Sequence, residues 1–193
     1  VLMLPFISGV LSAISTLVHE FGHSFLAWIF AYPSLPAFDF VYGGGVALHF
    51  EREEFLLWLI YAAFLGLMLR FGRRPATLVV LLGSITVYSM LAFSTGHQLL
   101  GIFMGHGMEV VISTLFLFRA LSGHATFHGL ERVLYAFVGF FLQFRALQFV
   151  YEFFTEPGFR AIYTQGKRGI TNDFQIIAWM LNVELPSVFG FFL

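Results

Sequence analysis

Long apolar stretches alternate with short polar ones along most of the chain. Apolar residues dominate at about 4–31, 55–71, 76–94, 103–121 and 133–154, and charged residues, glycine or proline bound each stretch. A helix needs about 20 mainly apolar residues to cross a membrane. The pattern therefore predicts an all-α membrane protein, a polytopic bundle of about five transmembrane helices within one integral membrane domain, residues 1–193.

Two segments depart from this pattern. Residues 37–50, AFDFVYGGGVALHF, place β-branched and aromatic residues around three glycines, which predicts a short β-like or re-entrant glycine loop after the first helix. Beyond Pro157 the apolar pattern weakens, and the run 174–183 is too short to span alone. The C-terminal segment 157–193 is therefore expected to lie at the membrane interface.

Composition supports a multi-pass membrane location with lipid as a partner. Of the residues, 59% are hydrophobic and 11% charged, whereas about a quarter of the residues in a soluble domain are charged. The net charge of −1 offers no electrostatic attraction for nucleic acid, so no nucleic-acid partner is expected. The chain has no cysteine, which excludes disulfides and thiolate metal sites.

The first apolar stretch contains a polar motif, LVHEFGHSF, at residues 17–25. In a helix, His19 and His23 lie on one face, one turn apart, and Glu20 lies beside them. This HExxH pattern is typical of a zinc (Zn2+) site in which the glutamate serves as general base. Charged groups at membrane depth cost about 2.5–3.5 kcal/mol each, which favours a functional site over a structural polar cluster.

A catalytic zinc needs a third protein ligand. Chain topology predicts Glu109, because two membrane crossings return the chain to the side of the histidines and Glu109 then lies at matching depth. A direct ligand would place its oxygen about 2.0–2.2 Å from zinc. His106 is the second candidate, as ligand or as oxyanion-stabilising donor. Asp173 ranks third, because it also fits as the N-cap of a short helix, and His97 is expected to be interfacial.

The residues His19, Glu20 and His23, with Gly22 and the surrounding apolar helix, resemble the site-2 protease family of intramembrane zinc metalloproteases. A β-like glycine segment after that helix is similar to the family as well. The resemblance implies a third ligand that is an aspartate in an L-D-G motif on a later helix. No L-D-G occurs in this sequence, and NVELP at 182–186 offers an asparagine and a proline at a different spacing.

The motif favours a zinc-dependent intramembrane metalloprotease, a hydrolase with Glu20 as catalytic residue and a membrane protein or peptide as substrate. A non-catalytic metal-holding or assembly subunit of a larger membrane complex is the alternative. A membrane di-iron oxygenase or desaturase is a third class, suggested by a second H-x-x-x-H at 124–128. The predicted topology places that second motif on the opposite side of the membrane from the first.

Overall fold

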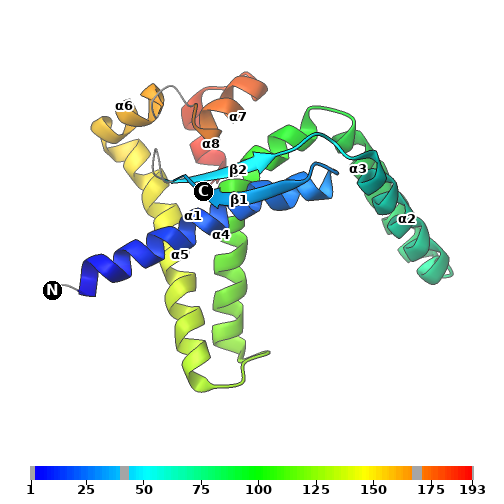
Figure 1. Cartoon of the computed structure of the whole chain (residues 1–193), viewed down its shortest axis with the longest axis horizontal. Helices are drawn as coiled ribbons and strands as arrows, with labels where there is room; N and C mark the ends of the chain where they lie inside the picture. The colour runs from blue at the N-terminus through cyan, green and yellow to red at the C-terminus, as the bar shows by residue number, and fades with distance from the viewer. Residues whose placement is uncertain (1–2, 40–43, 167–170, 193) are drawn as a thin grey trace.

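The computed structural model describes residues 3–39, 44–166 and 171–192. Within these ranges the chain forms a helical, membrane-type bundle of eight helices with one antiparallel pair of strands (Figure 1). The elements of the first half are α1 (Met3–Ile29), β1 (Ser34–Phe38), β2 (Gly45–His49), α2 (Glu54–Phe71) and α3 (Pro75–Ala92). Those of the second half are α4 (Gly96–Ser122), α5 (Gly129–Thr155), α6 (Pro157–Gln165), α7 (Asp173–Leu181) and α8 (Leu185–Phe192).

Among the described residues, four helices, α2 to α5, are long and apolar enough to cross a membrane. Their bounds follow the predicted stretches within a few residues, except that α4 begins at Gly96 rather than near residue 103. The residues that precede the fourth predicted stretch, 96–102, therefore form the first part of α4. This helix ends where Gly123 adopts a left-handed conformation, φ 67°, which glycine takes without a steric penalty.

α1 contains the first predicted stretch, but it crosses α4 and α5 steeply instead of running beside them (Figure 1). The crossing is close because Gly22 faces α4. A Cβ atom at Gly22 would lie 2.0 Å from the Met104 carbonyl oxygen, so any side chain there would push the two helices apart. In a bundle of parallel helices, residues equally far along two helices lie at the same depth in the membrane. Because α1 crosses α4 steeply, this does not hold for the two helices here.

The strand pair packs against α1. Trp28 Nε1 donates a hydrogen bond to the Ser34 carbonyl oxygen at 2.7 Å, and Ser34 Oγ donates to Ser24 Oγ at 3.0 Å. β1 starts inside YPSLP, the proline-containing run that follows the first apolar stretch. Pro36 is tolerated because both strands of a two-stranded sheet are edge strands. Residues 40–43 of the predicted glycine turn lie outside the described residues.

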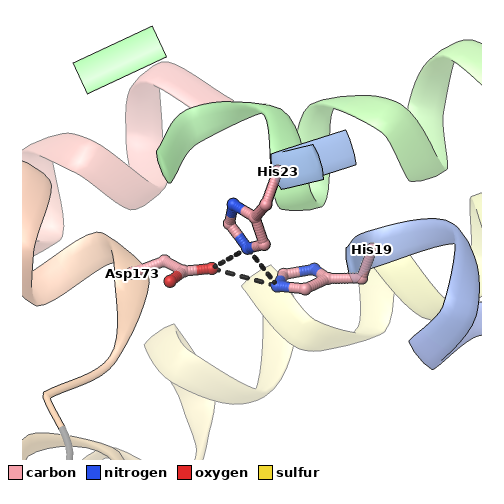
Figure 2. Close-up of side chains that lie close together, drawn as sticks. All are labelled: His19, His23 and Asp173. Carbon is pink, nitrogen blue, oxygen red and sulfur yellow. Dashed lines mark hydrogen bonds and ion pairs between the residues drawn. The ribbon is translucent and has the colours of Figure 1, made fainter. Parts of the chain in front are cut away.

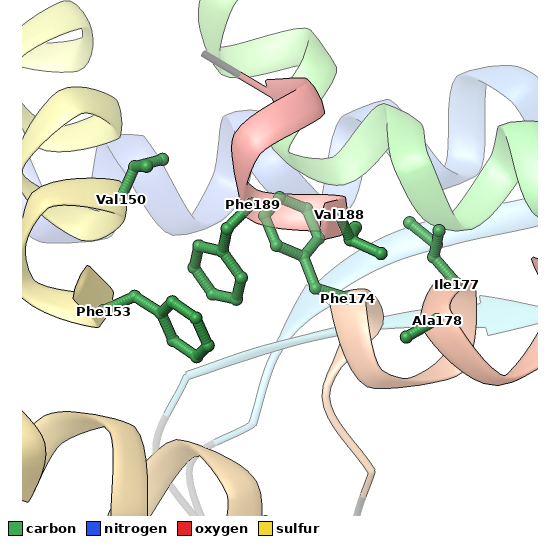
Figure 3. Close-up of a cluster of buried hydrophobic side chains, with 7 residues drawn as sticks. All are labelled: Val150, Phe153, Phe174, Ile177, Ala178, Val188 and Phe189. Carbon is green, nitrogen blue, oxygen red and sulfur yellow. The ribbon is translucent and has the colours of Figure 1, made fainter. Parts of the chain in front are cut away.

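Three short helices follow α5. α7 and α8 meet at a bend of 111°, the geometry of a broken span or a re-entrant loop. A buried apolar cluster holds them against α5 (Figure 3): the rings of Phe153 and Phe189 stack with centroids 3.7 Å apart, and Phe174 is fully buried beside them. This packing fixes the start of α7, where Asp173 lies.

Candidate metal centre

His19 and His23 lie one turn apart on α1 with their rings facing each other. The two Nε2 atoms are 3.1 Å apart, and the rings meet edge to face with centroids 4.8 Å apart. Glu20, the next residue after His19, is buried, with 8% of its surface exposed. The HExxH spacing therefore brings two imidazoles and one carboxyl group together on adjacent turns of α1.

Asp173 completes a cluster with both histidines (Figure 2). Its Oδ2 lies 3.0 Å from His19 Nε2 and 3.3 Å from His23 Nε2. The sequence offered Asp173 as the N-cap of this helix, but Asn172 takes that position: its backbone N–H donates to Gln175 Oε1 at 3.1 Å. Asp173 is thus the first residue of α7, and its carboxylate faces the two imidazoles.

A backbone contact sets the tautomer of His23. Its Nδ1 lies 2.8 Å from the carbonyl oxygen of Gly101. A carbonyl oxygen only accepts, so Nδ1 carries the proton and Nε2 carries the lone pair. Fixing one ring nitrogen in this way is how proteins present the other as a metal ligand. The lone pair of His23 therefore lies beside His19 Nε2 and the Asp173 carboxylate.

A second polar cluster surrounds Glu109, on the other side of His19. Ser15 Oγ donates to Glu109 Oε1, and His106 Nδ1 lies 3.1 Å from Glu109 Oε2. The same Oε2 is 3.9 Å from His19 Nδ1. The His106 ring stacks on Phe149 with centroids 4.6 Å apart. Glu109 is buried, and its charged neighbours among the described residues are imidazoles.

In the part of the chain that the structure describes, two sets of three residues therefore lie close enough to hold a metal ion: His19, His23 and Asp173, or His19, His106 and Glu109. They share His19 but approach different nitrogens of its ring, Nε2 for Asp173 and Nδ1 for Glu109. A neutral imidazole has one lone pair, so it serves one set at a time. Only the first set contains both histidines of the motif, and in the tautomer that serves this set His19 directs its Nδ1–H toward Glu109.

Two glycines give the cluster its room. A Cβ atom on Gly105 of α4 would lie 2.5 Å from His23 Nε2 and 2.7 Å from His19 Cε1. A Cβ atom on Gly45 of β2 would lie 2.3 Å from Glu20 Cγ. In the structure, the space over Gly105 is filled by the two imidazoles.

Replacing Gly105 by Ala is expected to lower zinc affinity at least about 10-fold, because the new methyl group displaces both rings from their positions. Competition with a chromogenic chelator measures the affinity. Gly66→Ala is the matched control: it makes the same change within a helix, α2, away from the cluster, and its Cβ would meet nothing within 4 Å. Unchanged affinity in Gly105→Ala would mean that the rings are free to shift without loss of the metal.

Other predicted candidates lie away from this cluster. His97, expected to be interfacial, stacks on Tyr32 with centroids 5.2 Å apart and lines a cavity beside His23. His124 and His128 follow the end of α4, which runs 17 residues beyond Gly105. At 1.5 Å per residue that end is about 25 Å away. The structure therefore does not bring the two H-x-x-x-H motifs together.

Sequence reasoning passed over His49, which lies at the end of β2 and lines the cavity beside His23. Burial lowers the pKa of its imidazole below the ordinary value. Its signal in the sequence was weak, because a single histidine after a glycine-rich turn has no motif partner.

No protein-family model, curated protein or solved structure matches this chain.

Proposed function

We propose that this chain is an integral, multi-pass membrane metallopeptidase that binds zinc through His19, His23 and Asp173. One observation carries the proposal: the Nε2 atoms of both histidines and Asp173 Oδ2 lie 3.0–3.3 Å from one another, with Glu20 adjacent. Lone pairs and a carboxylate that converge in a half-buried place favour a cation between them.

The donor set fits zinc. Catalytic zinc sites use three protein ligands, drawn from histidine and carboxylate, and leave a position open. Ligands about 2.0–2.1 Å from a tetrahedral ion lie about 3.3 Å from one another, close to the spacing of these three atoms. Iron in a di-iron site would need several more histidines nearby. The second H-x-x-x-H motif follows the far end of α4 and is too distant to supply them.

Glu20 is proposed to carry the proton in hydrolysis. Zinc bound at this site supplies Lewis-acid polarisation of the scissile carbonyl and activation of water. The Glu20 carboxylate accepts the proton of the attacking water and passes it to the leaving amide nitrogen. Gly45 has no side chain, so the Glu20 side chain can pack directly against β2.

The surroundings suit a substrate segment that comes from the membrane. The four helices α2 to α5, which are long and apolar enough to cross a membrane, expose most of their surface in the isolated chain, as lipid-facing helices do. β1 and β2 are edge strands beside Glu20, and an extended peptide can pair with such an edge.

Glu20 distinguishes a peptidase from a non-catalytic metal-holding subunit of a larger complex, because only catalysis requires its carboxylate.

Removal of the metal is expected to stop peptide hydrolysis, and one equivalent of zinc is expected to restore it. The measurement uses protein in vesicles with a quenched fluorescent peptide that has an apolar, membrane-inserting segment. 1,10-phenanthroline removes the metal, and the non-chelating 1,7 isomer is the control. Hydrolysis by metal-free protein, or two iron ions per chain by mass spectrometry, would contradict the proposal.

A further inference from the structure

A cavity of about 810 Å³ opens beside His23, between α1, β2, the start of α4 and α7. Its volume lies in the range of sites that enclose a small ligand or a few residues of peptide. The apolar part of its wall includes Phe30, Ile102, Ile176, Trp179 and Met180. Because His23 forms part of the same wall, a ligand in the cavity would adjoin the candidate metal centre.

The wall is free of formal charge. Among the described residues, the lining includes no Asp, Glu, Lys or Arg. This contrasts with the metal centre, where carboxylates meet imidazoles a few ångströms away. A charged side chain in the cavity would lose its hydration without gaining an opposite charge. The cavity therefore favours neutral groups.

Polar groups in the wall favour a peptide over a lipid acyl chain. His97 Nδ1 lies 2.6 Å from the Ser94 carbonyl oxygen, so its proton is used there and Nε2 remains an acceptor. Nε2 has no hydrogen-bond partner within the part of the chain that the structure describes, and the same holds for the side chains of Thr95 and Gln98. An extended peptide offers N–H and C=O groups to them, whereas an acyl chain offers none.

We propose that this cavity binds the substrate on one side of the scissile bond and selects bulky, neutral side chains against charged ones. The inference rests on the proposed peptidase function and adds its substrate class. The apolar wall contacts the side chain, and the unpaired polar groups hydrogen-bond the adjoining peptide backbone.

Peptides that differ at one position test the selection. Norleucine has the four-carbon chain of lysine without the ammonium group, and glutamine has the size and shape of glutamate, so each pair tests charge. With the charged member on the cavity side of the scissile bond, kcat/KM is expected to fall about 70- to 400-fold relative to its neutral partner. The same exchange on the other side is expected to have a smaller effect. Equal rates for both members of each pair at every position would overturn the inference.

A substitution in the wall tests the location. Gly101 lines the cavity, and a Cβ atom there would meet nothing within 4 Å. Gly101→Leu is expected to fill the space and reverse the preference, so that alanine is cleaved faster than leucine. Gly83→Leu is the matched control, because Gly83 is exposed on α3 and its Cβ is equally unobstructed. A wild-type leucine-to-alanine ratio in Gly101→Leu would overturn the inference.

A binding experiment separates this inference from the proposed function. A peptide with a diazirine analogue of leucine is irradiated with zinc-loaded Glu20→Gln protein, and labelled residues are found by mass spectrometry. Labels at 98–102 and 176–180 are expected. Those labels without cleavage by wild type would contradict the peptidase and leave the binding site. Cleavage with labels elsewhere would overturn the inference and leave the peptidase.

Discussion

Glu20→Gln is expected to abolish peptide hydrolysis while the protein still binds one zinc per chain. Glutamine keeps the shape of the side chain, so the packing against Gly45 is preserved. It cannot accept the proton of the attacking water, and loss of a general base costs about 10²- to 10⁴-fold in rate. The measurement is single-turnover hydrolysis in vesicles, with zinc content determined on the same sample.

Glu54→Gln provides the control for this substitution. Glu54 is exposed in the first turn of α2, away from the site, so its replacement by Gln makes the same chemical change without affecting the cluster. It is expected to retain wild-type rate. Hydrolysis at wild-type rate in Glu20→Gln would reduce Glu20 to a structural role and favour a non-catalytic metal-holding subunit.

Asp173→Ala is expected to weaken zinc binding by at least about 1000-fold, since it removes the anionic ligand and leaves two neutral imidazoles. Glu109→Gln is expected to cost only about 10- to 100-fold, because Glu109 acts on the metal through the orientation of His19. Competition with chelators of known affinity measures both values in detergent. His19→Ala and His23→Ala should match Asp173→Ala.

Asp173→Asn controls for the effect of the substitution on α7. It keeps the size of the side chain at the first helical position, so a loss of zinc in this variant reflects the missing charge. The opposite ranking, with Glu109→Gln more damaging than Asp173→Ala, would identify Glu109 as the third ligand, as depth along parallel helices predicts from the sequence.

The helices were predictable because their signal is local. Length and apolarity over 18 or more residues identify α2, α3, α4 and α5, and neither depends on what the helix contacts. The start of α4 was not predictable, because STGHQLLG contains polar residues and glycines that lower local apolarity. The crossing of α1 was also beyond the sequence, since it depends on the contact that Gly22 makes with Met104.

The candidate site divides in the same way. The pairing of His19 with His23 follows from helical spacing, a property of five consecutive residues. The place of Asp173 depends on Asn172 taking the cap and on the packing of Phe174 and Phe189, contacts between segments far apart in the chain. Glu109 drew attention by its isolation in an apolar run, and its partners Ser15 and His106 emerge only when α1 and α4 cross.

The distance along the chain between His19 and Asp173, 154 residues, has a consequence for biosynthesis. A ribosome releases the HExxH helix long before α7, so the nascent chain carries two histidines and a glutamate without the third ligand. We expect such a chain to hold zinc weakly and to cut nothing. Once α7 packs against α5, an ion joining α1 to α7 closes a loop of most of the protein, and such closure restricts the unfolded ensemble most when the loop is long. The metal would then stabilise the fold only after α7 has packed, and activity would begin only after α7 has been synthesised.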